Sequence, residues 1–97
     1  MFIDLDNRGT GKTTTLIHDA YFTGLPIVVP SVQRKGFVLG QAKNMGVDVT
    51  VYTIHELQEK RGTDKAFYGQ VLVDELEDTL ETCLGCKVVK ATMTRRL

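Results

Sequence analysis

Short apolar runs alternate along this chain with segments whose apolar residues recur at helical spacing. The runs of strand length are Phe2–Asp6, Pro26–Pro30, Val47–Ile54, Gln70–Val73 and Lys87–Ala91. A helical pattern follows each of the first four, and this alternation is typical of a mostly parallel sheet covered by helices. With 97 residues, the chain is long enough for one such domain and too short for two.

Residues that favour capping mark the ends of the predicted helices. Gly24 is expected to end the first helix, Ser31 to cap the start of the second and Gly46 to end it, and Gly85 to end the last one. A short helix is predicted from His55 to about residue 60, followed by a loop over 61–69. The predicted inner faces are Leu16, Ile17, Ala20 and Tyr21, then Phe37, Val38, Gln41, Ala42 and Met45, and finally Leu76, Leu80, Cys83 and Leu84.

Composition and charge exclude several classes of protein. The hydrophobic fraction is 42%, and 12 basic residues balance 12 acidic ones, so the chain is not expected to be disordered. No apolar stretch approaches the roughly 18 residues that span a bilayer, and Met1–Leu5 is too short for a signal peptide. We therefore expect a cytoplasmic protein, in the host cytoplasm if it is viral. The zero net charge gives no support for DNA as a partner.

The cysteine and histidine residues have ordinary interpretations. Cys83 and Cys86 have the spacing of a zinc knuckle or a redox pair, but His18 and His55 are the only further soft ligands and are distant in sequence. The pair also falls at a helix end, whereas redox pairs lie at helix starts. Partly buried, unreactive cysteines are expected. Neither histidine is expected to be catalytic.

Two groups of basic residues leave two interpretations open. Arg34, Lys35 and Lys43 are a phosphate-binding face or, as we prefer, a solubilising surface. Arg95 and Arg96 are an arginine finger for a neighbouring subunit or, as we prefer, a solvated tail.

The segment between the first predicted strand and the first predicted helix, Asp6 to Thr14, is rich in glycine and threonine. In such a loop, backbone N–H groups turn inward and form, with the helix N-terminus, a nest for polyphosphate oxygens. Gly9 and Gly11 permit a close approach of the main chain. Lys12 can then reach the β- and γ-phosphates, and the Thr13 hydroxyl can ligate the accompanying magnesium ion.

This segment resembles the Walker A motif of P-loop NTPases, in the form that ends Gly-x-Gly-Lys-Thr. The resemblance implies a three-layer α/β P-loop NTPase core with a mostly parallel five-stranded sheet, as a single minimal domain over residues 1–97. It implies ATP and Mg²⁺ as ligands, held by Arg8, Gly9, Thr10, Gly11, Lys12, Thr13 and Thr14. Asp6 stands where the motif has Gly or Ala, and its carboxylate opposes phosphate binding unless it pairs with Arg8 or turns away.

The run Val71-Leu72-Val73-Asp74-Glu75 resembles the Walker B motif, in which a strand delivers an acid at its C-terminal tip. The resemblance implies that Asp74 holds the magnesium ion through a water molecule and that Glu75 orients and deprotonates the attacking water. The alternatives, which we disfavour, are that the two acids are those of an ordinary helix N-terminus and that Gly9 to Thr13 is a mere turn.

Further segments resemble the first RecA-like domain of superfamily 1 and 2 helicases, in the additional-strand, catalytic-glutamate branch. Ala91-Thr92-Met93-Thr94 is similar to a motif that senses the γ-phosphate, which implies a catalytic role for Thr92; turn threonines are the alternative. Ile27–Ser31 and Thr53–Leu57 are similar to other helicase segments. In that arrangement, the strand Lys87–Ala91 separates the Walker B strand from the phosphate-loop strand.

The function implied is that of a Mg²⁺-dependent ATPase or an accessory factor in DNA metabolism, from a phage or mobile element, with Glu75, Lys12 and Thr92 as catalytic residues. Helicases close the site with a second RecA-like domain, so we expect self-assembly or a protein partner to complete it here. The alternative is a non-hydrolysing nucleotide-binding or inhibitory module that acts on a protein partner. A small-molecule kinase is disfavoured because Arg61–Gly69 is a poor lid.

Overall fold

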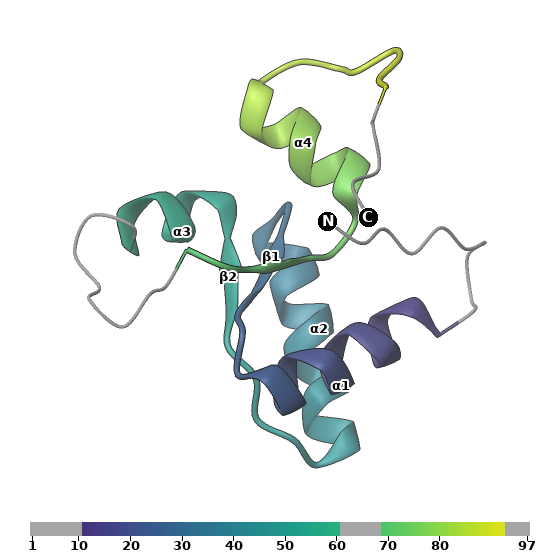
Figure 1. The fold of residues 1–97 in the computed structure, drawn as a ribbon, viewed down its shortest axis with the longest axis vertical. Helices are drawn as coiled ribbons and strands as arrows, with labels where there is room; N and C mark the ends of the chain where they lie inside the picture. Colours follow the sequence, from purple (N-terminus) through teal and green to yellow (C-terminus); the bar gives the residue numbers. More distant parts are fainter. Residues whose placement is uncertain (1–10, 61–68, 93–97) are drawn as a thin grey trace.

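The computed structural model describes residues 11–60 and 69–92 of the chain. The described residues form four helices and three strands (Figure 1). In chain order these are α1 (Lys12–Thr23), β1 (Ile27–Val29), α2 (Val32–Met45), β2 (Val51–Thr53), α3 (Ile54–Lys60), β3 (Leu72–Val73) and α4 (Leu76–Leu84).

The three strands form a parallel sheet in the order β2-β1-β3. Ile27 pairs with Val51 on one side of β1 and with Leu72 on the other. At the far end of β3, the N–H of Asp74 donates to the carbonyl oxygen of Val28 at 2.9 Å. The central strand therefore sets the position of the residue that follows β3.

The prediction of a five-stranded P-loop core is wrong. The described residues form a sheet of three strands, which is too small for such a core. The predicted strand Lys87–Ala91 is irregular, because the N–H of Val88 donates to Oε2 of Glu81 at 2.6 Å instead of to a neighbouring strand, and Val89 is 95% exposed. The predicted strand Phe2–Asp6 lies outside the described residues. The predicted order, with Lys87–Ala91 beside β3, therefore fails too.

One face of the sheet carries the core, and α1 and α2 pack against it. Successive strand residues point to opposite sides, so Ile27 and Val29 share this face. The buried cluster consists of Ile17, Ala20, Ile27, Val29, Val38, Ala42 and Val51. Because α1 and α2 also contact each other, the two helices form a single layer on that face.

The predicted helix ends are confirmed for the elements that carry the site. The Ser31 hydroxyl accepts the N–H of Arg34 at 3.1 Å and caps α2. Gly24, Gly46 and Gly85 end α1, α2 and α4. Capping depends on residues within one turn, so it can be predicted from a short stretch of sequence.

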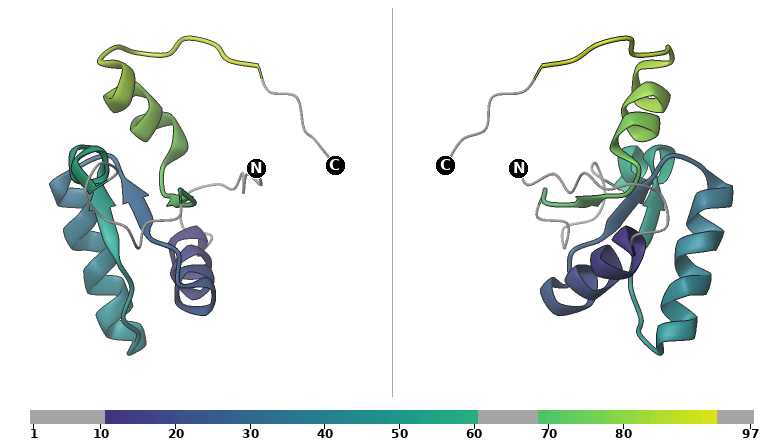
Figure 2. Two further views of the ribbon diagram at one scale, coloured as in Figure 1. Left: turned by 60° about the vertical axis from the view of Figure 1, so that its left-hand side comes forward. Right: turned by 90° about the vertical axis from the view of Figure 1, so that its right-hand side faces the viewer.

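The predicted inner face of α4 is not buried. Leu76, Leu80 and Leu84 are 40%, 39% and 58% exposed, whereas Thr79 is buried. Figures 1 and 2 show that α4 leaves the carboxyl end of β3 and stands beyond that edge of the sheet. Its apolar stripe therefore does not pack against the sheet as the helical spacing predicted.

Candidate functional site

Polar side chains from three elements meet at the carboxyl edge of the sheet. Thr13 lies in the first turn of α1, Arg34 lies in the first turn of α2 directly after β1, and Asp74 follows β3. The residues that follow neighbouring parallel strands lie at one edge of a sheet. Since β1 pairs with β3, Arg34 and Asp74 are brought side by side.

The Arg34 guanidinium bridges Thr13 and Asp74. Its Nε donates to Oδ2 of Asp74 at 2.5 Å, and its Nη2 lies 3.4 Å from Oδ1 of the same carboxylate. The same Nη2 donates to the Thr13 hydroxyl at 2.9 Å. The hydroxyl of the Walker A-like segment and the carboxylate of the Walker B-like segment thus share one cation.

Asp74 is held from both sides of its backbone. Its N–H is bonded to the sheet, and its carbonyl oxygen accepts the Thr79 hydroxyl at 2.9 Å. Both residues are buried, at 6% and 8% exposed. These two bonds hold the backbone in the position from which the carboxylate contacts Arg34. The sequence analysis did not identify Thr79.

Glu75 has a backbone conformation that is uncommon for a residue with a side chain. Its φ and ψ of 55° and 66° are left-handed, and it is the N-cap of α4. Such conformations cost free energy and tend to occur at functional sites. Its carboxylate is 44% exposed, and its Oε1 lies 3.6 Å from Nη2 of Arg34. Glu75 therefore stands beside the Thr13–Arg34–Asp74 group with access to solvent.

Arg34 is a firmly held cation. The hydrogen bond with Asp74 raises the pKa of Arg34, partial burial opposes this, and the negative charges of Asp74, Glu75 and Asp78 reinforce it. Its Cζ also lies 4.5 Å from the centroid of the Phe37 ring, close enough for a cation–π contact. We expected Arg34 to be a surface residue, and the structure instead places it in the centre of the site.

The start of α1 lies in the same region. Gly11 is its N-cap with φ of 82°, a value that favours glycine, and its carbonyl oxygen accepts the N–H of Thr15 at 3.0 Å. Lys12 is the first helical residue and is half-buried, while Thr14 is exposed. The remaining predicted ligands, Arg8, Gly9 and Thr10, lie outside the described residues, as does Asp6.

Thr92 is not brought to this group. It is exposed and lies in the irregular segment that follows α4. Figure 1 shows that this segment leaves the end of α4 farthest from the sheet. The predicted contact between Thr92 and a γ-phosphate depended on a fifth strand at 87–91, which the structure does not have.

The Thr13 and Asp74 side chains suit a magnesium ion that arrives with phosphates. Mg²⁺ is usually held by one or two carboxylates together with substrate phosphates and water. Asp74 offers one buried carboxylate and Thr13 one hydroxyl. Within the described ranges, no group of three or more His, Cys, Asp or Glu residues is placed to hold a metal by itself. Thr13 and Asp74 thus supply one hydroxyl and one carboxylate, a donor set that suits a metal whose other ligands are phosphates and water.

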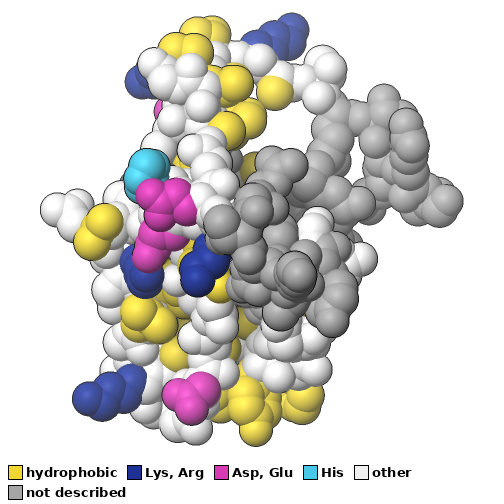
Figure 3. Space-filling model, turned by 90° about the vertical axis from the view of Figure 1, so that its left-hand side faces the viewer, with side chains coloured by type: hydrophobic (Ala, Val, Ile, Leu, Met, Phe, Trp, Pro, Cys, Tyr) yellow, Lys and Arg dark blue, Asp and Glu magenta, His cyan; other side chains and the backbone are white. Residues whose placement is uncertain are grey.

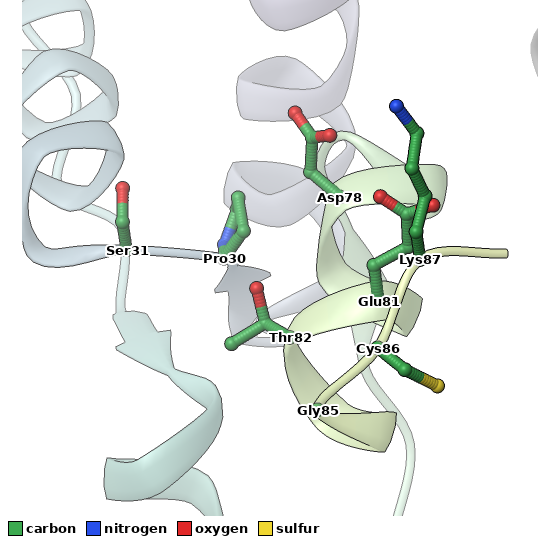
Figure 4. A pocket seen from close by; sticks show the side chains of 8 residues that line it. All are labelled: Pro30, Ser31, Asp78, Glu81, Thr82, Gly85, Cys86 and Lys87. Carbon is green, nitrogen blue, oxygen red and sulfur yellow. The ribbon is translucent and has the colours of Figure 1, made fainter.

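A hollow lies between the β1–α2 turn and α4, with a volume of about 610 Å³ (Figure 4). Pro30 and Ser31 line it on one side, and Asp78, Glu81 and Lys87 line it on the other. The Glu81 carboxylate already accepts the Val88 N–H. Cys86 also lines the hollow, and like Cys83 it is an exposed free thiol, so the prediction of partly buried cysteines is wrong.

A separate ion pair joins α2 to α3. Lys35 Nζ lies 2.9 Å from both carboxylate oxygens of Glu56. Glu56 Oε1 also accepts the N–H of Thr53 at 3.0 Å, and the Thr53 hydroxyl accepts the N–H of Glu56 at 3.2 Å. The hydrogen bond from Thr53, aided by Lys35, lowers the pKa of Glu56. Figure 3 shows acidic and basic side chains intermingled on this face, without a basic stripe.

No protein-family model, curated protein or solved structure matches this chain. No helix in the described part of the chain is long and apolar enough to cross a membrane.

Proposed function

We propose that this chain binds a nucleoside triphosphate with Mg²⁺ at the carboxyl edge of the sheet, between the start of α1 and the end of β3. The observation that carries the proposal is the bridging of Thr13 and Asp74 by Arg34. These two residues are far apart in sequence, and their types are those needed to hold a nucleotide-bound magnesium ion. Their meeting at one point is what such a site requires.

The start of α1 supports phosphate as the ligand. The N-terminus of a helix carries a partial positive charge and unpaired N–H groups, and both attract phosphate oxygens. The first turn of α1 contains no acidic residue, and Lys12 is its first residue. A triphosphate at this end would meet a cation and helix N–H groups with no competing carboxylate from the same turn.

The metal would be held by Thr13 directly and by Asp74 directly or through water. When bound with the nucleotide, Mg²⁺ neutralises charge on the phosphates. The protein's own contribution is to fix the position of the Asp74 carboxylate through Val28 and Thr79 and to keep it nearly free of solvent.

Hydrolysis is assigned to Glu75. Its carboxylate is exposed enough to contact a water molecule, and its backbone is held at the start of α4. A carboxylate in that place can orient a water and accept its proton. The protein is then an ATPase or an accessory factor, and a further copy or a protein partner covers the open side of the site. The intermingled surface charges give no independent support for DNA binding.

The test is equilibrium binding of a fluorescent ATP analogue in the presence of Mg²⁺. Lys12→Ala removes the phosphate cation, and we expect it to weaken binding by about tenfold or more. Lys43→Ala removes a lysine charge from the last turn of α2 and should leave binding unchanged. Glu75→Gln should bind the analogue normally. In a separate assay of ATP hydrolysis, it should not release phosphate.

Equal weakening by Lys12→Ala and Lys43→Ala would show that net charge, and not a site at α1, governs binding. Unchanged turnover in Glu75→Gln would remove Glu75 from its assigned role and leave the nucleotide site itself standing.

A second candidate function is a non-hydrolysing module that engages a protein partner. The exposed stripe Leu76, Leu80 and Leu84 on α4 favours it, because apolar side chains at this spacing form one helix face. This function predicts a partner complex that is lost with Leu80→Glu and retained with Lys12→Ala. A complex lost with Lys12→Ala would count against it.

A further inference from the structure

The position suited to a metal at this site is taken by a side chain of the protein itself. Arg34 Nη2 lies 2.9 Å from the Thr13 hydroxyl oxygen and 3.4 Å from Oδ1 of Asp74, while Nε lies 2.5 Å from Oδ2. One guanidinium therefore uses both oxygens of the carboxylate and the hydroxyl at once.

A guanidinium and Mg²⁺ cannot occupy this position together. Mg²⁺ binds oxygen at about 2.0–2.1 Å, so an ion on the Thr13 and Asp74 oxygens would lie almost where Nη2 now lies. Two cations at that separation repel each other strongly beside a carboxylate that is nearly buried. One of them must leave before the other binds.

Local charge determines which cation is favoured. With Arg34 in place, its positive charge faces the negative charges of Asp74 and Glu75. Adding Mg²⁺ alone would place three positive charges, one of Arg34 and two of the metal, against the two negative charges of Asp74 and Glu75. Adding Mg²⁺ with a triphosphate brings enough negative charge to balance the metal and to give a released guanidinium a new partner.

We propose that Arg34 is an internal competitor of Mg²⁺. It keeps the metal off Thr13 and Asp74 until a triphosphate arrives, and it then leaves Asp74 to the metal and binds phosphate itself. The inference rests on the proposed function for its second step only. The first step, exclusion of free Mg²⁺ by Arg34, does not require that the chain binds a nucleotide.

Release is physically accessible because the Arg34 side chain reaches solvent, although Thr13, Asp74 and Glu75 all contact it. Its side chain is 25% exposed, and it lies in the first turn of α2 over the Phe37 ring. A change of side-chain rotamer takes the guanidinium away from Asp74 without moving α2. The planar group has five N–H donors, which suit phosphate oxygens as well as a carboxylate.

The first experiment measures binding of Mn²⁺, a paramagnetic substitute for Mg²⁺, by electron paramagnetic resonance without nucleotide. Arg34→Met keeps an unbranched apolar stem and removes the guanidinium with its charge, and we expect about tenfold tighter Mn²⁺ binding than in the wild type. Lys35→Met removes the same charge from the next residue, where it pairs with Glu56, and should give no gain. Adding Asp74→Asn to Arg34→Met should abolish the gain.

Equal Mn²⁺ affinities of the wild type and Arg34→Met would overturn the proposal, and so would an equal gain in Lys35→Met. Circular dichroism establishes that each variant is folded.

The second experiment uses the wild type only, so it does not depend on a variant that folds. The Nε–H of Arg34, bonded to Asp74, should give a distinct NMR signal that millimolar MgCl₂ leaves unchanged and that MgCl₂ with ATP shifts or broadens. A shift with MgCl₂ alone would contradict the proposal. Failure of ATP to bind at all would contradict the proposed function, while the Mn²⁺ comparison would still decide the role of Arg34.

Discussion

At the scale of single residues, Asp74 and Arg34 depend on each other. Asp74 is 6% exposed, and Arg34 is the cation that neutralises it among the described residues. A buried carboxylate that loses its cation pays the cost of desolvation without compensation. The pair therefore contributes both to the stability of the fold and to the geometry of the candidate site.

Asp74→Asn should weaken both properties. The amide keeps the size of the side chain and loses the charge, so we expect the free energy of unfolding in urea to fall by about 1–3 kcal/mol. Mg²⁺-dependent binding of ATP should fall as well. Asp48→Asn changes an exposed acid and is the matched control. A variant with full stability and full Mg²⁺ dependence would show that Asp74 has neither role.

The sequence predicted Asp74 and Thr13 as site residues from local motifs, and both contact Arg34 in the structure. It did not predict Arg34 itself. The partner of Arg34 is determined by the pairing of β1 with β3, which is a contact between residues far apart in the chain. The available signal was the position of Arg34 in the first turn of the helix that follows a strand, at the edge where Asp74 also lies.

At the scale of elements, α3 is tied to α2 and β2 by Glu56. The carboxylate accepts the Thr53 N–H and pairs with Lys35. Helix ends such as Ser31 and Gly46 could be predicted because capping is local. The strand at 87–91 could not be excluded from its sequence, because Val88 and Val89 suit a strand and only the folded position of the segment, where the Val88 N–H bonds Glu81, decides against it.

Glu56 should make stability depend on pH. The Thr53 hydrogen bond and Lys35 lower its pKa in the folded protein, so its contribution is present above the ordinary pKa of about 4.3 and is lost as the pH falls through the lower folded value. Glu56→Gln should reduce the free energy of unfolding at pH 7 by at most about 1 kcal/mol, since the side chain is 40% exposed. The difference from the wild type should shrink below about pH 4.

Urea unfolding at several pH values measures this effect, with Asp48→Asn as the control. A difference between wild type and Glu56→Gln that grows as the pH falls would have the wrong sign for a lowered pKa.

At the scale of the whole molecule, the described core is small. Ile17, Ile27, Val29 and Val38 are its largest fully buried side chains, and α4 projects from the sheet with its apolar stripe exposed. A ligand at the junction of α1, α2 and β3 would join three elements and stabilise the folded state by mass action. The Thr13–Arg34–Asp74 group already joins α1, α2 and the end of β3 at that edge.

Calorimetric titration of the folded wild-type protein with ATP, in the presence and absence of Mg²⁺, tests the central claim most directly. The account predicts one nucleotide per chain and tighter binding with Mg²⁺. No heat of binding under either condition, from protein shown to be folded in the same sample, would contradict it.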